Sequence, residues 1–349
     1  MIRVLDLIPN MIMGSQFSLR LRAIKQFVDI VDVLDITAPP TIWYKIANRL
    51  FQYGLPIPLP DTGRANYKLK KQVLQNSYDI IWVEKGLTIS DSTIKYIKNI
   101  QPNIIIVNMT PDNMMERPWQ SLQYMRCLPL YDYHITTKPF IVEDFYRRGA
   151  KKVILVNKTF QRDFHYPRTI TDEERTLLGA DVGFIGTWEK ERCDSLIYLA
   201  EHGVKVKVFG EWEWKKYKGK YKNLTIVPHA LFDDNYAKAL SAFKISLCFL
   251  KKRAYDKTTA RSIEIPACGG FMLAERTKEH LDLFEENKEA VYFSSNEELL
   301  EKCNYYLLHE EERKAIAAAG RKRCVNSDYS NDKMIRYVID IILKEKSDL

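Results

Sequence analysis

Short apolar runs alternate with longer amphipathic segments along nearly the whole chain, and this alternation constrains the fold more than any other feature of the sequence. A strand, a helix and a further strand in succession form the unit from which parallel sheets with helices on their faces are built. The pattern therefore predicts an α/β protein. Its strands are expected near residues 2–8, 31–36, 79–84, 103–108, 133–137, 152–156, 181–186, 204–209, 224–228, 245–250, 271–274 and 290–293.

The segments between the predicted strands have the character of helices that pack one face on a sheet. They are expected near residues 16–28, 43–52, 65–76, 91–99, 139–148, 190–202, 233–243, 259–268, 278–285, 296–308 and 310–325. A last amphipathic helix is expected from about residue 331 to residue 346. Two successive strand–helix series of this kind indicate two doubly wound domains.

The chain has 349 residues, which is enough for two domains of ordinary size. The segment Lys158–Thr176 is charged, aromatic and aperiodic, with Pro167 inside it, so we expect the domain boundary in this region. We predict a first domain over residues 1–165, a second over residues 166–330 and a C-terminal helix within residues 331–349.

The bulk composition limits the partners and the compartment. A net charge of +8 favours anionic partners such as a nucleotide diphosphate, an acidic glycan, lipid head groups or nucleic acid, without choosing among them. The six cysteines form no C-x-x-C pair and several lie in apolar segments, which predicts buried reduced thiols in a cytosolic protein. The sequence opens directly on a strand and holds no run of ~18 apolar residues, so we expect neither a signal peptide nor a transmembrane helix.

Residues 256–275 combine an acid, a base and a second acid ahead of a double glycine. Arg261 and Glu264 are three residues apart and so lie on one face of the predicted helix. The glycines end that helix, and the apolar run Phe271–Ala274 that follows is typical of a short buried strand. Arginine suits a phosphate and glutamate suits a pair of sugar hydroxyls, so the pattern indicates a nucleotide-sugar site.

This stretch resembles the donor half of GT-B glycosyltransferases of the group 1, family-4-like type, in particular the CgeB-like branch. Asp181–Arg192 resembles the strand, glycine and arginine that open the second domain of that branch, and the likeness spans about residues 129–330. It implies two doubly wound Rossmann-like domains facing across a cleft. The N-terminal domain would bind the acceptor, the C-terminal domain would bind the nucleotide-sugar donor, and the last helix would cross back to the first domain.

The resemblance also implies roles for the residues of this stretch. Family-4-like enzymes have an acid at the position of Glu264 that binds the donor ribose, and a second acid eight positions earlier. This sequence has Asp256 there, and its shorter side chain puts the usual role of the earlier acid in doubt. Lys257 and Arg261 are alternative or additional ligands of the diphosphate, and Arg192 is assigned to the diphosphate as well.

Other predicted donor residues follow strands of the second half, because ligands of doubly wound sheets lie beyond the carboxyl ends of the strands. Gly186 and Thr187 precede a helix whose start, near Lys190, would present backbone N–H groups to a phosphate. Two further strand ends, at Gly210 and at His229-Ala230, would flank the nucleotide base. The alternative for all of them is an ordinary strand-to-helix turn with surface charges.

Three strand ends of the first half carry candidate residues for the acceptor side. Gly14 and Ser15 form a flexible point after the first strand, Glu84 ends the third strand and Asp112 follows the fourth. A general base has to be an acid or a histidine within reach of the acceptor hydroxyl, so Asp112 is the first candidate and Glu84 the second. Both could instead be turn caps, and a retaining transferase can use its own leaving phosphate as the base.

The segment from Trp43 to Lys71 is aromatic and basic. It holds six basic residues against the single acid Asp61. This composition suits a membrane interface or an anionic acceptor, and it equally suits a solvated helix face with packing aromatics.

The predicted activity is transfer of a sugar from a nucleotide-diphosphate sugar to a hydroxyl of a glycan or lipid-linked acceptor, in the cytoplasm or at the inner face of a membrane. We expect the reaction to be retaining. We expect no metal and no cofactor, because the histidines lack metal-ligand spacing and neither a P-loop nor a G-x-G-x-x-G motif is present. A nucleotide-sugar epimerase of the same fold stays open as an alternative. A basic nucleic-acid-binding protein is the alternative from another class, although no nucleic-acid reader motif is present and we expect no nucleic-acid partner.

Overall fold

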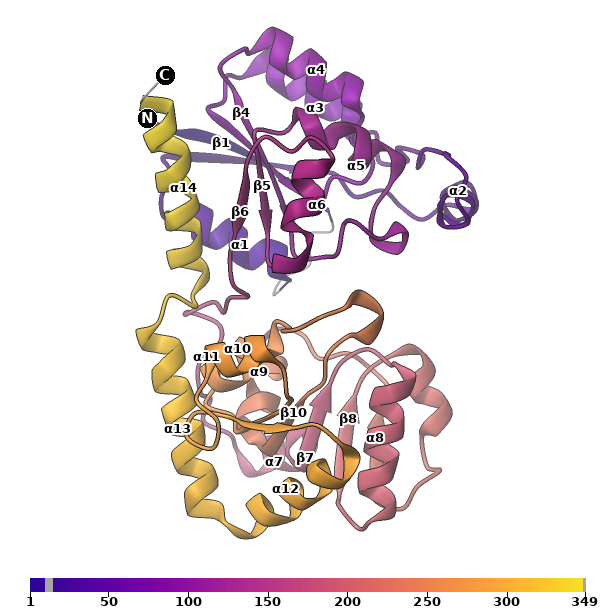
Figure 1. The fold of residues 1–349 in the computed structure, drawn as a ribbon, viewed down its shortest axis with the longest axis vertical. Helices are drawn as coiled ribbons and strands as arrows, with labels where there is room; N and C mark the ends of the chain where they lie inside the picture. Colours follow the sequence, from indigo (N-terminus) through magenta and orange to yellow (C-terminus); the bar gives the residue numbers. More distant parts are fainter. Residues whose placement is uncertain (10–14, 348–349) are drawn as a thin grey trace. The chain divides into compact units, whose positions relative to one another are not determined.

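The computed structural model describes residues 1–9 and 15–347. The chain divides into two compact units (Figure 1). Unit 1 comprises residues 1–157 together with the C-terminal residues from Met334 onward, and unit 2 comprises Lys158–Lys333. The change of unit after Asn157 comes earlier than the boundary predicted after residue 165.

Unit 1 contains a six-stranded parallel sheet with the order β2-β1-β3-β4-β5-β6. Val4 on β1 pairs with Val31 on β2 and with Ile80 on β3, so β1 lies inside the sheet. The strands are β1 (Arg3–Ile8), β2 (Ile30–Asp35), β3 (Ile80–Glu84), β4 (Ile105–Thr110), β5 (Tyr133–Thr136) and β6 (Val153–Leu155). The helices are α1 (Gln16–Ile24), α2 (Ile42–Gln52), α3 (Ala65–Gln75), α4 (Asp91–Ile100), α5 (Leu122–Cys127), α6 (Val142–Arg147) and α14 (Asn331–Ser347).

Helices cover both faces of this sheet, as expected for strands that are apolar on both sides. On one face, Ile24 of α1 and Ile335 and Ile339 of α14 pack against Val4 and Trp82 of the strands. On the other face lie α3, α4 and α5, whose buried side chains contact the alternate residues of the same strands. Helix α14 begins in unit 2 and packs its apolar side into unit 1 (Figure 1).

Unit 2 contains a second six-stranded parallel sheet, with the order β12-β11-β10-β7-β8-β9. Its strands are β7 (Ala180–Ile185), β8 (Val206–Phe209), β9 (Leu224–Val227), β10 (Phe243–Cys248), β11 (Met272–Glu275) and β12 (Val291–Phe293). Its helices are α7 (Asp172–Leu178), α8 (Lys190–Glu201), α9 (Asp233–Ala242), α10 (Arg261–Ala267), α11 (Lys278–Leu283), α12 (Asn296–Leu308) and α13 (Glu310–Asn326). Short 3₁₀ helices of the two units are η1 (Arg117–Trp119), η2 (Leu128–Leu130), η3 (Pro139–Ile141), η4 (Trp212–Tyr217) and η5 (Lys252–Ala254).

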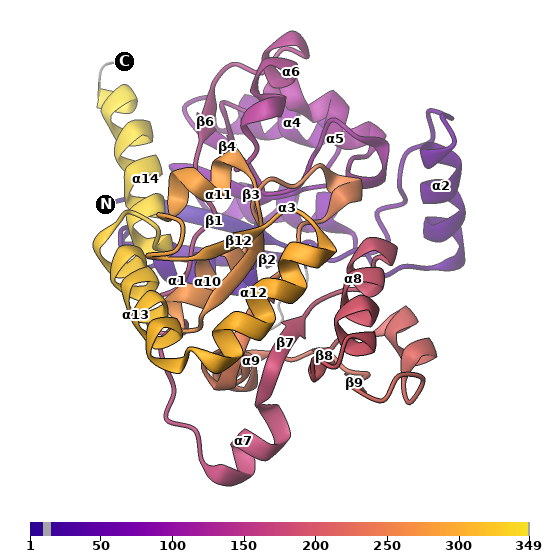
Figure 2. The same ribbon diagram turned by 60° about the horizontal axis from the view of Figure 1, so that its bottom comes forward.

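The second sheet is also covered on both faces (Figure 2). Leu196 of α8 and Leu299 of α12 pack with Val182 and Phe184 of β7 on one face. Residues of α9, α10 and α11 pack with Ile185 and their neighbours on the other face. The predicted α/β fold with two doubly wound units is therefore confirmed.

Each of the twelve predicted strands overlaps an observed strand, whereas two short helices were not predicted. Helix α7 lies in the segment that the sequence presents as aperiodic, because Leu178 is the one buried residue among its seven. The helix begins at a capping box formed by Thr171 and Glu174 rather than at an apolar stripe. Helix α5 is six residues long, too short for a helical period to show.

All six cysteines are buried free thiols, which confirms the predicted burial and lack of disulfides. Within residues 1–9 and 15–347, none of the helices is long and apolar enough to cross a membrane.

Candidate functional site

From the order of the strands in unit 2 we expect a ligand crevice between β7 and β10. The chain leaves β7 toward β8 and β9 on one side, and returns to β10, β11 and β12 on the other side. Ligands of doubly wound sheets bind at such a reversal, beyond the carboxyl ends of the two strands. Gly186 and Thr187 follow β7 at this point, and Leu250 follows β10.

Arg192 bridges these two strand ends. Its side chain comes from the first turn of α8 and is only 3% exposed. Nε donates to the backbone oxygen of Leu250 at 3.3 Å, and Nη1 donates to the backbone oxygen of Thr187 at 3.1 Å. The guanidinium is therefore fixed at the reversal point rather than extended into solvent.

A second guanidinium lies close to the first. The guanidinium carbons (Cζ) of Arg192 and Arg261 lie 5.9 Å and 5.7 Å from the centre of the same aromatic ring, that of Phe184 on β7. Burial, and after it the neighbouring Arg261 cation, lowers the pKa of Arg192 from its usual value. The Nε atom of Arg261 is buried and has no hydrogen-bond partner in the part of the chain that the structure describes.

The carboxylates near this pair do not balance its charge fully. Glu189 Oε2 is 3.7 Å from Arg192 Nη2, beyond hydrogen-bond distance. Glu275, at the end of β11, accepts a hydrogen bond from the Leu250 backbone N–H at 2.9 Å and forms an ion pair with Lys252. A buried arginine beside a second, partly buried one, with neither nearby acid in hydrogen-bond contact with the pair, favours an added anion, and a diphosphate carries enough charge to pair with both.

Glu264 lies on α10 one turn beyond Arg261 and is buried. Its Oε2 accepts a hydrogen bond from the Tyr236 hydroxyl at 2.5 Å, and its Oε1 lies 3.6 Å from Nε2 of His165. The Gln161 backbone N–H donates to His165 Nδ1, which leaves the ring proton on Nε2, facing Glu264. Burial lowers the pKa of His165 and keeps the ring neutral, so both partners orient the carboxylate without adding a counter-charge.

Two of the predicted strand-end glycines pack directly on each other. A Cβ atom on Gly210 would lie 2.4 Å from the backbone oxygen of Gly186 and 2.5 Å from the Trp214 ring. Trp214 Nε1 donates to that same oxygen at 2.9 Å. The ends of β7 and β8 can approach this closely because position 210 has no side chain. His229 and Ala230 follow β9, and the exposed His229 ring meets Phe209 edge-on at 6.2 Å.

The remaining predicted donor residues lie at the surface of unit 2. Lys190 is exposed and pairs with Asp194 one turn along α8, at 2.5 Å. Lys257 is exposed, and its backbone oxygen accepts a hydrogen bond from the Thr277 hydroxyl at 2.8 Å. Asp256 is partly exposed, and its backbone N–H donates to Lys251.

In unit 1, Glu84 is enclosed in an ion pair. Its side chain is fully buried, and both oxygens accept hydrogen bonds from Arg20 at 2.7 Å. Trp82 Nε1 donates to the same carboxylate at 3.1 Å. A general base has to reach the acceptor, and a fully buried carboxylate held by arginine is poorly suited to that role. This geometry favours a structural role for Glu84 over the predicted catalytic one.

Asp6 of β1 is buried beside this pair. Neither of its oxygens has a hydrogen-bond partner among residues 1–9 and 15–347. Burial, and after it the neighbouring Glu84 carboxylate, raises the pKa of Asp6 well above its usual value. Burial therefore favours the neutral form of the Asp6 carboxyl, and the charge of Arg20 is balanced by Glu84.

Asp112 lies where the sequence predicts it, after the carboxyl end of β4. It forms an ion pair with Lys85, which follows the neighbouring strand β3, and the two side chains are 28% and 29% exposed. Asp112 thus remains accessible at the edge where a ligand of unit 1 is expected. Ser15 caps α1 by accepting a hydrogen bond from the Ser18 N–H at 3.3 Å, and Gly14 lies outside the described residues.

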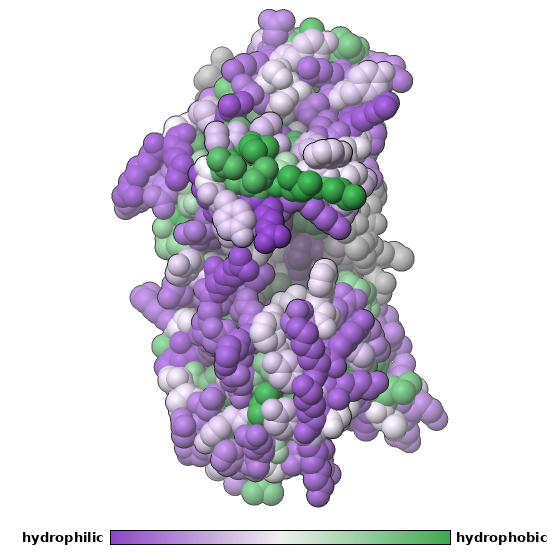
Figure 3. Space-filling view, turned by 90° about the vertical axis from the view of Figure 1, so that its right-hand side faces the viewer, coloured by the Kyte–Doolittle hydropathy of each residue, from purple (hydrophilic) through white to green (hydrophobic). Residues whose placement is uncertain are grey.

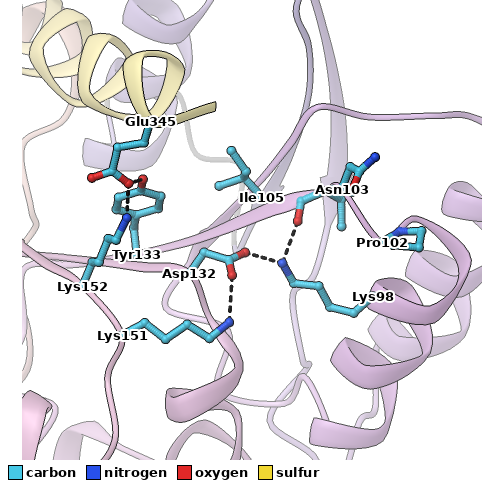
Figure 4. Close-up of a pocket in the computed structure, with 10 residues that line it drawn as sticks. Lys98, Pro102, Asn103, Ile105, Asp132, Tyr133, Lys151, Lys152 and Glu345 are labelled. Atoms are coloured by element: carbon cyan, nitrogen blue, oxygen red, sulfur yellow. Dashed lines mark hydrogen bonds and ion pairs between the residues drawn. The ribbon is translucent and has the colours of Figure 1, made fainter. Parts of the chain in front are cut away.

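A cavity of about 520 Å³ lies at the opposite edge of this sheet (Figure 4). It is lined by the amino ends of β4, β5 and β6 and by Glu345 of α14. Its charged groups pair with one another, Lys98 and Lys151 with Asp132 and Lys152 with Glu345. We therefore assign it no part in the site above. No group of three or more metal-ligating side chains occurs among the residues that the structure describes.

Comparison with known proteins agrees with this geometry in unit 2. Residues 192–340 match the family model described as glycosyl transferase-like. The match covers unit 2 from Arg192 onward and the first part of α14. No curated protein matches the chain significantly. The CgeB-like branch is not tested by these comparisons and stays a prediction.

Solved structures show that the whole chain shares the GT-B fold. Sucrose-phosphate synthase from Thermosynechococcus elongatus superposes with a TM-score of 0.67 at 11% identity, over 100% of both chains. HepE from Anabaena, solved in complex with UDP and glucose, gives a TM-score of 0.64 at 11% identity, over 99% of this chain and 100% of that one. A putative UDP-N-acetylglucosamine 2-epimerase from Listeria monocytogenes gives 0.63 at 11% identity, over 100% of this chain and 97% of the other.

Proposed function

We propose that the protein is a glycosyltransferase that uses a nucleotide-diphosphate sugar as its donor and binds that donor in unit 2. The observation that carries the proposal is the pair of guanidiniums of Arg192 and Arg261 over the Phe184 ring, at the reversal point of the sheet. The glycosyl transferase-like family match over residues 192–340 supports it. So does the GT-B fold shared with HepE, which was solved with UDP and glucose.

The arginine pair would act on the leaving group. When an acceptor oxygen attacks the anomeric carbon, the bond from that carbon to the diphosphate oxygen breaks and negative charge grows on the diphosphate. Arg192 and Arg261 are held where they can offset this charge, and groups fixed in advance cost no rearrangement as the reaction proceeds. Lys190 and Lys257 would add to the positive field from the surface.

Glu264 would bind the donor ribose. Tyr236 and His165 orient its buried carboxylate, and a carboxylate accepts hydrogen bonds from hydroxyl groups such as those of a ribose. Gly186 with Thr187 would lie beside the phosphates, and Gly210, His229 and Ala230 beside the base. Asp256 would face the sugar end of the donor.

The acceptor would be a hydroxyl of a glycan or of a lipid-linked sugar, bound at the carboxyl edge of the sheet in unit 1. We propose a retaining, metal-independent reaction in which the leaving phosphate takes the acceptor proton. The resemblance of the donor half to a retaining family supports this, and Asp112 is already held in an ion pair with Lys85.

A donor screen tests the proposal. Thermal unfolding is measured with UDP-, GDP-, ADP-, CMP- and dTDP-sugars, since a ligand at about 100 times its dissociation constant adds about 2.7 kcal/mol to the stability. We expect one class of nucleotide sugar to raise the melting temperature, and Arg261→Met to remove the rise. The control is Arg175→Met, which changes an exposed arginine on α7. Absence of any response to all five donor classes would contradict the proposal.

The epimerase alternative is separated by its products. The donor found in the screen is incubated with the protein alone and with candidate glycan or lipid-linked acceptors. A transferase forms a glycosylated acceptor and releases the nucleoside diphosphate. An epimerase converts the donor into a second sugar without any acceptor, and that result would replace the transferase proposal.

A further inference from the structure

Helix α2 leaves large apolar side chains in solvent. Ile42 is 75% exposed and Trp43 74% exposed, and Tyr53, which ends the helix, is 74% exposed. The helix buries only Ala47 and Phe51. Several large apolar side chains exposed together on one helix are characteristic of an interaction surface.

The exposed side chains share one face of the helix. At about 100° per residue, Ile42, Ile46 and Tyr53 fall within about 40° of one another, and Trp43 lies about 60° further round the helix. Phe51 lies on the opposite side and Ala47 lies between it and Trp43; these two are the buried residues of the helix. We call the four exposed residues Ile42, Trp43, Ile46 and Tyr53 the apolar face of α2.

Basic residues lie along one border of the apolar face. Lys45 and Arg49 are both exposed, and the guanidinium of Arg49 lies over the Tyr53 ring at 5.9 Å. Further along the chain Arg64, Lys68 and Lys71 are exposed as well, whereas Asp61 is the one acid between Trp43 and Lys71. An apolar helix face bordered by lysine and arginine is typical of helices that lie in the surface of an anionic bilayer.

The helix is anchored to unit 1 from its inner side. The Phe51 backbone oxygen accepts a hydrogen bond from Arg117 Nη1 at 2.6 Å, and the Arg117 guanidinium lies 5.0 Å from the Phe51 ring. Figure 1 shows α2 standing out from the rest of unit 1, and Figure 3 shows a band of apolar residues on that side of the unit. The anchored inner side leaves the apolar face outward.

We propose that α2 docks unit 1 on an anionic membrane surface. Ile42, Trp43 and Ile46 would enter the boundary between head groups and acyl chains. Lys45 and Arg49 would lie among the anionic head groups. The combination of exposed aliphatic side chains, a tryptophan and bordering cations fits a lipid surface in both apolar and charged character.

The docking would also bring the acceptor edge of unit 1 to the membrane. Helix α2 follows the carboxyl end of β2, and Lys85 and Asp112 follow the carboxyl ends of β3 and β4 at the same edge of the sheet. A lipid-linked acceptor is presented at a bilayer surface, so this edge would meet it there. This step rests on the proposed function, whereas the docking itself does not.

Vesicle binding tests the docking. The full chain is sedimented with phosphatidylcholine vesicles that contain or lack phosphatidylglycerol. We expect binding to the anionic vesicles and at least tenfold weaker binding of the double variant Ile42→Ser/Trp43→Ser, because two apolar side chains no longer leave water. Both positions are exposed, so the variant should keep its melting temperature.

Charge reversal on the same helix tests the electrostatic part. Lys45→Glu/Arg49→Glu should weaken binding to anionic vesicles at least tenfold. Lys215→Glu/Lys222→Glu, the same charge change at exposed positions of unit 2, should weaken it much less. Wild-type binding in both α2 variants, or equal binding to vesicles with and without the anionic lipid, would overturn the proposal.

Two further readouts keep the outcome clear. If the wild type is a dimer in sedimentation velocity and Ile42→Ser/Trp43→Ser makes it a monomer, the apolar face binds a second copy and the membrane proposal fails. The donor-induced rise in melting temperature is recorded in the same variants. If the donor does not raise the melting temperature while vesicle binding is as expected, the donor-site proposal fails and the docking proposal stands. If the donor raises the melting temperature and the α2 variants bind vesicles as the wild type does, the docking proposal fails and the donor-site proposal stands.

Discussion

The two units share an architecture and differ in how arginine is paired near the reversal of strand order. Each is a six-stranded parallel sheet with helices on both faces, and each has a reversal of strand order, between β1 and β3 in unit 1 and between β7 and β10 in unit 2. In unit 1, Arg20 packs near this reversal and forms a bidentate ion pair with Glu84. In unit 2, Arg192 and Arg261 share the ring of Phe184, with the nearest acid at 3.7 Å.

We infer from this difference that the Arg20–Glu84 pair stabilises the fold, whereas the two arginines of unit 2 serve to bind an anion. Closing a buried cation with a carboxylate balances it in the folded protein, and removing one member leaves the other uncompensated. Two neighbouring cations without enough acidic groups to neutralise them repel each other and lower the stability of the folded protein. An anionic ligand that binds between them removes this repulsion. Sites of this kind often lower the stability of the protein that carries them. The fold alone therefore does not distinguish the two units, and the charge balance at the reversal point is our reason for proposing unit 2 as the donor-binding unit.

The largest expected effect comes from removing one member of the Arg20–Glu84 ion pair. Glu84→Leu removes the carboxylate that pairs with Arg20, and the neighbouring Asp6 can replace it only by ionising in a buried site, so the free energy of unfolding should fall by about 3–5 kcal/mol. Chemical denaturation measures the change. The double variant Arg20→Met/Glu84→Leu removes both charges and should recover most of the loss. A loss below about 1 kcal/mol in the single variant would show that the pair is not closed in the way described.

Unit 1 should also show a dependence on pH that originates from a buried histidine. Burial lowers the pKa of His134 from 6.5 to about 4, so below pH 6.5 the unfolded chain takes up a proton that the folded chain does not. Stability is therefore complete above pH 6.5 and should fall by about 3 kcal/mol as the pH falls to 4. His134→Gln keeps a donor for the Leu128 oxygen and should flatten this part of the profile. An unchanged slope in the variant would exclude His134 as its origin.

A smaller effect is expected at the ribose position of unit 2. Glu264→Ala should weaken donor binding by about 1–3 kcal/mol, because two ribose hydroxyls lose their partner in a buried site. Calorimetric titration with the donor measures it. Glu191→Ala, an exposed acid on α8, is the matched control. Equal affinities of the Glu264 variant and the wild type would remove Glu264 from the site.

The smallest effect is expected at Asp112. Asp112→Asn keeps the shape of the side chain and removes its basicity, and a retaining reaction should proceed within a few-fold of the wild-type rate. A general base would instead account for roughly 100- to 10,000-fold. Turnover at saturating donor, with the melting temperature as a check on folding, distinguishes the two. A loss of ~100-fold or more would make Asp112 the base and unit 1 part of the chemistry.

The fold was predictable from the sequence because buried parallel strands read as short apolar runs. All twelve strands were found in this way, together with the helices that carry a clear apolar stripe. Helix α7 could not be predicted, because a helix with one buried residue shows no apolar periodicity in its sequence. The start of this helix is defined by a capping box instead. The break between units falls at Asn157, ahead of the aperiodic segment, because contacts rather than composition define it.

The candidate site was predictable only in part. The spacing of Arg261 and Glu264 on one helix pointed to a phosphate and a ribose. Nothing in the sequence shows that Phe184 brings Arg261 beside Arg192, because a phenylalanine in a buried strand looks like core. For Glu84, the sequence predicts a catalytic candidate and the geometry favours a structural role, for a related reason. Its partner Arg20 lies on a different element, and such a long-range pair leaves no local signal.

The most direct test compares nucleoside diphosphates with their nucleosides on the wild type and on Arg261→Met. UDP, GDP, ADP and dTDP are each measured beside the matching nucleoside by thermal unfolding. The account predicts that at least one diphosphate stabilises the wild type and its nucleoside does not. It also predicts that Arg261→Met without ligand is at least as stable as the wild type, since it relieves the repulsion from Arg192, and that it binds the diphosphate at least tenfold more weakly. A variant that binds the diphosphate as the wild type does, or that is clearly destabilised without ligand, would contradict the central claim that unit 2 holds an unbalanced cationic pair for a diphosphate.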